Sequence, residues 1–547
     1  MPLVSSAGAP TLAMLAVMAA TFLLVVALSR HRSKASMSST AARGLPLPPG
    51  PPGLPVVGSM HQMLANKPVF RWLHRLLEHS GGEILRVRLG PVNVVVVACP
   101  EMAREVLRKN DAVFADRPTT FAAESFSMGY RSVSISPYGD QWRKMRRVLT
   151  AEVLSPATEN RLRGTREDEA DHLLRYVHAQ CAAGGVIDVR HVARHFCGNL
   201  IRRLTLGRRH FRPTAAAGAV AGPGPDEVEH VDALFAVLNY LDAFCVSDYF
   251  PALVGLDLDG HEKVIRAVMS TLNRLHDPVI EDRVEEWRLL RKAGERREIA
   301  DFLDVLASLD GGAGRPLLTV QEIKSQAIDI MIASIDNPSN AVEWALAEMM
   351  NKPDTMRKAM AELDGVVGRD RLVQEPDLRG LNYLKACIRE AFRLHPYHPF
   401  NPPRVAMADT TVAGYSIPRG SQVILSRVGL GRNPKVWDEP LEFRPERHLD
   451  LAGDATVGLG EPELRFLSFS TGRRGCPGIS LGTLITVMLL ARLLQGFTWS
   501  KPPGVDRVEL QEADASLVMA GPLRLQAKPR LPARLYQAKH DGSAQEM

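Results

Sequence analysis

The stretch Ser468–Phe497, "SFSTGRRGCPGISLGTLITVMLLARLLQGF", decides the fold. It places Cys476 between a glycine-rich turn and a long apolar segment that has the period of a helix. A thiolate is stabilised by a helix N-terminus and by nearby cations, and two arginines precede this cysteine. Glycines at 472, 475 and 478 allow tight turns and let the backbone approach a flat, bulky group. The pattern therefore indicates a nucleophile or a metal ligand at Cys476.

The composition is that of an ordinary globular protein with a large core. Of 547 residues, 45% are hydrophobic and 23% are charged, and no linker-like break divides the body, so one large domain is expected. The six cysteines are scattered without paired spacing, at Cys99, Cys181, Cys197, Cys245, Cys387 and Cys476. This usage favours a reducing compartment and argues against a disulfide framework or a zinc site.

The N-terminal segment is apolar and then basic. Residues 12–28, "LAMLAVMAATFLLVVAL", carry no charge, and "RHRSK" follows from Arg30. A run of this length can cross a bilayer, and positive charge after it places the following body on the cytoplasmic side. A cleaved secretory signal and an organellar transit peptide are the alternatives, but the run is long and no basic region precedes it. We predict an anchor over 1–29, a basic and Pro-rich hinge over 30–58, and a catalytic domain over 59–547.

The body is predicted to be mainly α with minor β. "EILRVRLGPVNVVVVACP" alternates, turns at Gly90-Pro91 and resumes, which is typical of a hairpin. Further strand candidates are "TVAGYSIPRGSQVILS" and "ASLVMAGPLRLQ". Thr319 and Glu322 have the spacing of a capping box, so a long central helix should begin there and end near Asn351, before a proline.

The cysteine segment resembles a known family. Phe469, Gly472, Arg474, Cys476 and Gly478 match F-x-x-G-x-R-x-C-x-G, the haem-ligand signature of the cytochrome P-450 haem-thiolate monooxygenases. Other motifs of that family follow its order over nearly the whole chain. The resemblance implies a single large cytochrome P-450 fold domain behind an N-terminal transmembrane helix, and haem b with its iron bound by Cys476.

The resemblance also assigns residues to the haem. "WRKMR" places Trp142 and Arg146 one helical turn apart, so both can face a haem propionate. Arg404 and Arg474 are the further candidates for propionate pairing, and Phe469 and Gly478 belong to the cofactor-binding segment by position.

A second group of motif residues is assigned to fold integrity. Glu390 and Arg393 in "EAFR", with Arg447 in "FRPER", match the family's buried ion-pair network. An arginine–carboxylate network holds geometry and has no evident proton-transfer task.

The resemblance implies that electrons reach the haem from NADPH through a separate reductase, and that dioxygen is the second co-substrate. The chain itself has no flavin or nicotinamide fingerprint. Arg143, Lys144, Arg147 and Arg465 are a candidate basic docking face for an acidic partner, or simply a solvated charged surface. No nucleic-acid partner is expected.

The central helix departs from the family's pattern. Most members carry A-G-x-D/E-T-T/S, and this chain has Ala333 to Pro338 at these positions. Asp336 keeps the acid of the pattern, whereas Asn337 replaces the threonine that follows it. A hydroxyl can accept one proton while donating another, whereas an amide is a poor proton relay at neutral pH. We predict catalytic roles for Asp336 and Asn337. Pro338 lacks an N–H, so it should free the carbonyl of Ser334 and bulge the helix locally.

Several phrases resemble one branch, the plant amino-acid N-monooxygenases that form aldoximes: "DNPSNAVEWA", "FRPERH", "SFSTGRRGCPG" and "DYFPALVGLDLDGHEK". This implies two N-hydroxylations of an L-amino acid, then loss of water and carbon dioxide, by a single-pass protein of the endoplasmic reticulum membrane with a cytosolic catalytic domain. An aromatic substrate, phenylalanine or tyrosine, is preferred. The substrate-contact candidates are Phe121, Phe126, Arg131, Leu517 and Met519.

Three other functions compete with this one. A haem-thiolate isomerase or dehydratase would need neither dioxygen nor reductase, and the missing threonine gives it some support. A carbon hydroxylase would give no oxime, and a haem-binding sensor would show no turnover.

Overall fold

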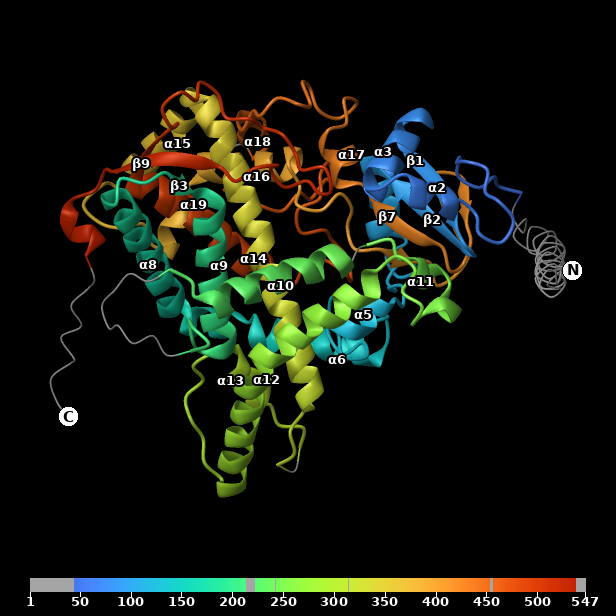
Figure 1. Cartoon of the computed structure of the whole chain (residues 1–547), viewed down its shortest axis with the longest axis horizontal. Helices are drawn as coiled ribbons and strands as arrows, with labels where there is room; N and C mark the ends of the chain where they lie inside the picture. The colour runs from blue at the N-terminus through green and yellow to red at the C-terminus, as the bar shows by residue number, and fades with distance from the viewer. Residues whose placement is uncertain (1–43, 213–221, 242, 313, 453–455, 538–547) are drawn as a thin grey trace, which may run out of the picture.

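The computed structural model describes residues 44–212, 222–241, 243–312, 314–452 and 456–537 (Figure 1). The predicted anchor, 1–29, and residues 30–43 of the predicted hinge lie outside the described residues. The helices are α2 Met60–Ala65, α3 Val69–His79, α4 Pro100–Arg104, η1 Glu105–Lys109, α5 Phe121–Phe126, α6 Asp140–Val148, η2 Leu149–Val153, α7 Pro156–Arg161, α8 Arg163–Ala182, α9 Val189–Leu206, α10 Pro225–Leu241, α11 Val246–Tyr249, η3 Pro251–Leu253, α12 His261–Ala293, α13 Phe302–Ser308, α14 Val320–Asn351, α15 Pro353–Val366, η4 Glu375–Gly380, α16 Asn382–Leu394, α17 Arg427–Gly431, α18 Glu446–Ala452, α19 Ile479–Gly496 and η5 Ala533–Tyr536. The strands are β1 Ile84–Leu89, β2 Val92–Val97, β3 Ile187–Asp188, β4 Arg404–Val405, β5 Thr410–Val412, β6 Tyr415–Ile417, β7 Gln422–Leu425, β8 Phe497–Ser500 and β9 Arg524–Pro529.

The long helix α14 runs through the middle of the helical body (Figure 1). Its predicted capping box is confirmed: the Glu322 N–H donates to Thr319 Oγ1 at 3.2 Å, and the Thr319 N–H donates to Glu322 Oε2 at 2.8 Å. Its end at Asn351 is also as predicted, because Pro353 opens the next helix. Helices α9, α16 and α19 pack against α14, so this helix is buried along most of its length.

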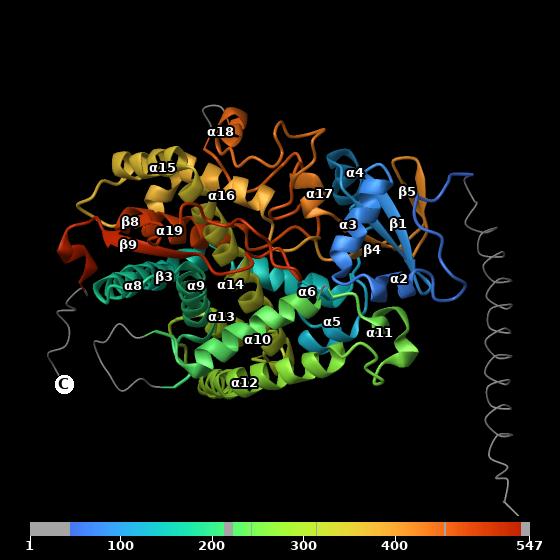
Figure 2. The same ribbon diagram turned by 45° about the horizontal axis from the view of Figure 1, so that its top comes forward.

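The main sheet lies to one side of the helices, next to α2 and α3 (Figure 2). The predicted hairpin is confirmed: β1 pairs with β2 in antiparallel register, with Val87 opposite Val94. The strand β7 then joins the hairpin in parallel, with Val95 opposite Val423, and the sheet order is β1-β2-β7-β4. A three-stranded sheet, β3-β9-β8, and the pair β5-β6 complete the β structure of the described residues.

The second half of the predicted hinge is attached to the body. The Pro46 carbonyl accepts from the Ser416 N–H at 2.8 Å, and the Pro49 carbonyl accepts from the Arg86 N–H at 2.7 Å. A side chain at Gly50 would collide with the Arg86 carbonyl, so the backbones lie in direct contact there. Residues 46–58 therefore contact the strands β1 and β6, and the domain boundary at 59 stays a prediction.

Pro338 does not interrupt α14. The helix runs without a break from Val320 to Asn351, with the proline inside it. The neighbouring serines bond back to the helix: Ser334 Oγ donates to the Ile330 carbonyl and Ser339 Oγ to the Ile335 carbonyl, each at 2.8 Å. Pro338 still has no N–H to offer the Ser334 carbonyl.

Two described segments, Pro225–Tyr249 and Ile479–Gly496, are long and apolar enough to span a bilayer. The second, α19, is a core helix, because 72% of its apolar window is buried inside the protein. Its hydropathy therefore reflects packing within the fold.

Candidate active site

A cavity of about 270 Å³ lies between α14 and the segment that carries Cys476. Its α14 wall includes Ala333, Asn337 and Pro338, and its other wall includes Phe469 and Cys476. The two walls come from segments far apart in sequence. Of the six cysteines, all of them described, only Cys476 lines this cavity. Its thiol is exposed to the cavity interior.

Local backbone contacts hold the Cys476 loop open toward the cavity. The Cys476 N–H donates to the Phe469 carbonyl at 2.8 Å, and the Gly475 N–H donates to the Gly472 carbonyl at 2.9 Å. Gly472 has a φ of +75°, and a Cβ there would meet Asp111, so this position requires glycine. Asp111 accepts from the Arg473 N–H at 3.1 Å and from its guanidinium at 2.7 Å. No sequence motif pointed to Asp111 as a residue of this site.

The electrostatics of the thiol are balanced between burial and positive charge. Burial raises the pKa of Cys476, while the Gly478 N–H and the guanidinium of Arg146 lower it in part. Gly478 is the N-cap of α19, so the thiol lies at the positive end of this helix. Coordination to a metal cation would favour the thiolate further.

The donors at the rim of the cavity fit an anionic cofactor. Trp142, Arg146 and Arg404 all line the cavity. The indole Nε1 of Trp142 and the Nε of Arg404 are buried and have no hydrogen-bond partner in the described part of the chain. Buried N–H groups are costly when unpaired, so a ligand with acceptor oxygens fits here. Arg146 Nη1 donates to the Gly475 carbonyl at 2.8 Å and ties α6 to the cysteine loop. These donors and the single thiol fit a haem with propionate groups.

Arg474 is a clamp between the loop and the segment ahead of α6. It lines the cavity, but its guanidinium donates to the backbone carbonyls of Ala115 and Ser136 at 2.7 Å and of Val133 at 3.3 Å. It also lies over the Trp142 ring at 4.6 Å. Burial lowers the pKa of Arg474 to about 10, with Arg404 adding to the effect. Three of its N–H donors are therefore already used by backbone carbonyls, and the propionate pairing stays a prediction.

Asn337 and Asp336 face different environments. Asn337 lines the cavity, whereas Asp336 is buried beside α9, with its Oδ1 3.8 Å from Arg194 Nε. Among the described residues, no hydrogen-bond donor reaches either oxygen of Asp336. Burial raises the pKa of Asp336 to about 7, although Arg194 lowers it. This carboxyl can therefore hold or release a proton near neutral pH.

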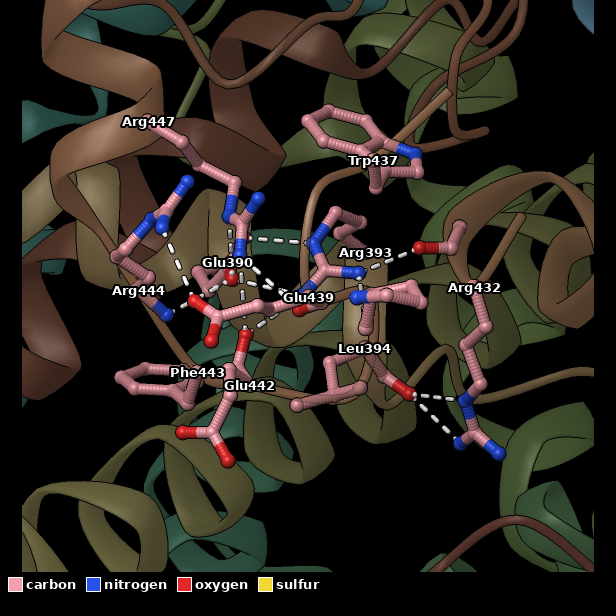
Figure 3. Close-up of polar contacts among 12 residues, drawn as sticks. Glu390, Arg393, Leu394, Arg432, Trp437, Glu439, Glu442, Phe443, Arg444 and Arg447 are labelled. Atoms are coloured by element: carbon pink, nitrogen blue, oxygen red, sulfur yellow. Dashed lines mark hydrogen bonds and ion pairs between the residues drawn. The ribbon is translucent and has the colours of Figure 1, made fainter. Parts of the chain in front are cut away.

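Glu390 is the centre of a buried ion-pair cluster (Figure 3). Arg393 Nη2 donates to Glu390 Oε1 at 2.7 Å, Arg447 Nε donates to the same oxygen at 3.1 Å, and His448 Nε2 lies 2.8 Å from Oε2. The guanidinium groups of Arg393 and Arg447 lie over the Trp437 ring at 5.2 and 5.7 Å. Burial would raise the pKa of Glu390, but the hydrogen bonds from Arg393 and His448 outweigh it and lower the value to about 2. The sequence reading did not include His448 in the cluster.

The five predicted substrate contacts do not line this cavity. Phe126 and Met519 are buried in the hydrophobic core, and the Leu517 carbonyl accepts from Trp344 Nε1 at 3.2 Å. Phe121 lies under the Arg266 guanidinium at 4.9 Å, and Arg131 is half-buried. Position in a family's pattern placed them near the cavity, but local packing turns them into the core or toward other elements.

Other polar groups also line the cavity. Gln326, Asp329 and Ser134 belong to its wall, and Asp329 Oδ2 accepts from the N–H groups of Val133 at 3.2 Å and Ser134 at 3.0 Å. Burial raises the pKa of Asp329, and the Ser134 contacts lower it only in part. No sequence motif marked these residues, because an acid inside a helix pattern gives no sign of a loop packed against it.

Comparison with known proteins agrees with this geometry. The sequence model of the cytochrome P450 family matches residues 48–528. The chain is 61% identical over 495 residues to a tyrosine N-monooxygenase of Sorghum bicolor, covering 90% of this chain and 87% of that protein. It is 50% identical to a phenylalanine N-monooxygenase of Prunus mume, covering 93% and 95%. It is 51% identical to a tryptophan N-monooxygenase of Arabidopsis thaliana, covering 90% and 89%.

Among solved structures, a zebra fish cytochrome P450 is similar with a TM-score of 0.65 and 24% identity, over 85% of this chain and 100% of that one. This likeness concerns the fold. Together, the family match, the mainly helical architecture and the cavity with one thiol show that the chain belongs to the cytochrome P450 family of haem-thiolate monooxygenases.

Proposed function

We propose that this chain converts an aromatic L-amino acid to its aldoxime. One amino acid, two dioxygen, two NADPH and two protons would give one aldoxime, one carbon dioxide, three water and two NADP⁺. Two N-hydroxylations consume the dioxygen, and loss of carbon dioxide and water from the N,N-dihydroxy acid forms the oxime. The 61% identity to a tyrosine N-monooxygenase carries the proposal, because it extends over both walls of the cavity.

Cys476 would supply a thiolate ligand to the haem iron, and Trp142, Arg146 and Arg404 would hold the propionates. The bound haem supplies activation of dioxygen, for which a thiolate ligand favours O–O cleavage. Phe469 and Gly478 line the face of the cavity next to the thiol and shape it for a flat group. The cluster of Glu390, Arg393 and Arg447 would stabilise the fold through its buried ion pairs. None of the three residues lines the cavity, so a direct role in the reaction is not assigned to them.

Asn337 would act as a hydrogen-bond donor within the cavity. Its amide can orient water or dioxygen but cannot both release and take up a proton at neutral pH. Asp336, with its raised pKa, would hold the proton that the amide cannot supply, and water would carry it into the cavity. Asn337 and Asp336 would thus share the task that a single hydroxyl performs in the usual family pattern.

The substrate preference is for an aromatic side chain. Relatives that act on tyrosine and phenylalanine support it, at 61% and 50% identity. L-Tyrosine and L-phenylalanine differ by one hydroxyl, and a site that hydrogen-bonds this group would discriminate strongly against the substrate that lacks it.

The electron donor would be an NADPH-dependent reductase. Three of the four basic side chains predicted to form a docking face are paired: Arg143 with Asp140 at 2.7 Å, Lys144 with Glu322 at 2.8 Å and Arg465 with Glu461 at 3.1 Å. Their net contribution to docking is therefore smaller than the sequence suggests. Arg147 stays exposed on the same helix as Arg143 and Lys144.

The protein would be held in the endoplasmic reticulum membrane by one N-terminal helix, with the catalytic domain in the cytosol. Deleting residues 2–29 should move most of the protein from the membrane fraction to the soluble fraction, because this deletion removes the apolar segment. Retention of the shortened chain on membranes washed with high salt would contradict a single anchor.

The decisive experiment is product analysis. Membranes containing this chain and a reductase are supplied with NADPH and each L-amino acid in turn, and oximes are measured by mass spectrometry. We expect oxime and carbon dioxide from tyrosine or phenylalanine, and neither from a Cys476→Ser control. A ring-hydroxylated product would identify a carbon hydroxylase instead, and turnover without NADPH consumption would identify an isomerase or dehydratase.

A further inference from the structure

Three potential metal ligands meet outside the haem cavity. Cys245 is the N-cap of the short helix α11, and Asp259 and His261 flank the start of α12. Their ligand atoms all lie within 4.8 Å of one another. Cys245 Sγ is 2.6 Å from His261 Nδ1, which in turn is 3.8 Å from Asp259 Oδ2. Among the described residues, no other group of three such side chains comes as close.

The donor set selects a class of metal. A thiolate, an imidazole and a carboxylate suit zinc, whereas magnesium and calcium prefer oxygen ligands alone. Zinc sites with three protein ligands hold water in the fourth position. Ligand atoms around a tetrahedral zinc lie roughly 3.5 Å apart, given bonds of about 2.0–2.3 Å. The His261–Asp259 separation of 3.8 Å already fits, and the Cys245 and His261 atoms need to separate by about 1 Å.

The surrounding contacts orient the ligands for this role. Asp259 Oδ2 accepts from the Val246 N–H at 2.7 Å, which fixes the carboxylate beside Cys245. At the N-terminus of α12, Asp257 accepts from the N–H groups of Glu262 at 2.8 Å and Lys263 at 3.1 Å, while Asp259 accepts from the His261 N–H through its other oxygen, Oδ1, at 3.4 Å. The His261 ring stands edge to face against Tyr240 at 5.3 Å. Hydrogen bonds and packing of this kind are what position metal ligands.

We propose that Cys245, Asp259 and His261 bind one zinc ion. The ion would join the two ends of the segment 245–261 and hold this segment against α12. The spacing of cysteines in the sequence argued against zinc, because it pairs no two cysteines. The fold instead brings one cysteine together with a histidine and an aspartate.

The position gives the ion a structural task near the substrate cavity. A smaller cavity of about 40 Å³ is lined by Phe244, Asp248 and Tyr249, which lie next to Cys245 in the chain. It shares Arg117 and Pro402 with the haem cavity. Closing the loop would restrict the movement of this shared wall. The inference does not depend on which amino acid is the substrate.

The experiment uses the full haem-loaded chain in detergent. After incubation with equimolar zinc chloride and dialysis, iron and zinc are counted together, and zinc X-ray absorption reports the ligands without interference from the haem. We expect about one zinc per chain, with one sulfur neighbour near 2.3 Å. Cys245→Ser and His261→Gln should lower bound zinc by about tenfold or more. The matched controls Cys181→Ser and His79→Gln should retain it, because both residues lie outside the cluster.

Specific results would overturn the zinc proposal. Less than about a tenth of a zinc per wild-type chain, or a zinc spectrum without sulfur, would overturn it whatever the variants do. Equal zinc in the wild type and in folded Cys245→Ser and His261→Gln, judged by unchanged haem content, would also overturn it. Amide hydrogen exchange gives a second readout: removing zinc with a chelator should speed exchange in 246–260 at constant haem content, and no change there would exclude the structural task.

Discussion

Asn337 is the residue at which this chain differs most from the usual chemistry of its family. The amide lines the cavity, while the acid beside it is directed away toward Arg194. In the proposed mechanism, proton delivery would be shared between two neighbouring side chains that lie on different faces of α14. This arrangement makes the amide a positioning group, and its effect should appear in coupling more than in binding.

Replacing Asn337 tests this division. Asn337→Ala should lower oxime formed per NADPH about fivefold and raise the release of peroxide, because one hydrogen bond worth about 1 kcal/mol is lost in the reacting complex. Asn340→Ala, on the same cavity wall, is the matched control and should change coupling less. Asn337→Thr restores a relay hydroxyl. If its product, rate and peroxide yield all equal those of the wild type, the proposed role of the amide is wrong.

Arg146 provides a second test at this scale. Arg146→Met should speed haem loss roughly tenfold or more, because a charged hydrogen bond worth about 1.5–3 kcal/mol is removed at the cavity rim. Transfer of haem to apomyoglobin measures the rate. Arg143→Met is the control, since Arg143 is exposed on the same helix and pairs with Asp140. Equal rates of haem loss in the two variants would show that Arg146 does not hold the haem.

At the scale of elements, the Glu390 cluster joins α16 to the segment that ends at α18. Glu390→Gln leaves the guanidinium groups of Arg393 and Arg447 buried without their counter-charge, which costs about 3–5 kcal/mol. We expect little folded, haem-loaded protein, measured by thermal unfolding and the carbon monoxide spectrum. Glu101→Gln breaks the exposed pair with Arg104 and should cost less than about 1 kcal/mol. Equal stability of the two variants would contradict a structural role for the cluster.

The elements that sequence predicts well are those that local patterns specify. The hairpin β1–β2, the capping box of α14 and the helix after Cys476 each follow from neighbouring residues. The parallel pairing of β2 with β7 joins residues more than three hundred positions apart, and periodicity carries no information on it.

The same limit applies to the site. Cys476, Trp142, Arg146 and Arg404 could be assigned because a sequence motif or the family's order marks each of them, and all line the cavity. Asp329 and Gln326 could not, because they line the cavity only through the packing of the 131–136 segment on α14. The predicted substrate contacts failed to reach the cavity for the converse reason: sequence position fixes the segment, but packing fixes the direction of the side chain.

For the whole molecule, buried histidines determine the response to acid. Burial lowers the pKa of five of them to about 4 or below: His74, His172 and His276 to about 4, His398 to about 3 and His195 to about 2. The unfolded chain binds protons at these rings below pH ~6.5, while the folded chain does not, so stability falls as pH drops from about 6.5 toward 4. Asp248 and Asp336 act in the opposite direction, because burial raises the pKa of each to about 7.

Among the described residues, ten histidines have a lowered pKa and six acids have a raised one, so the histidines outnumber the acids and the unfolding temperature should be higher at pH 7.5 than at pH 5.5. Circular dichroism at a fixed heating rate and constant ionic strength checks this difference. An unfolding temperature that rises toward pH 5.5 would mean that the buried acids outweigh the histidines.

The pairing of the last strand, β9, with β3 has a consequence for synthesis on the ribosome. The α14 wall of the haem cavity leaves the ribosome well before the cysteine wall. The strand β3 cannot pair with β9 until β9 has been synthesised. A nascent chain therefore exposes the apolar surface that α19 will cover until α19 itself has left the ribosome. Haem capture must therefore wait until the Cys476 segment has left the ribosome, and chains truncated before α19 should be recognised by chaperones and proteases as unfinished.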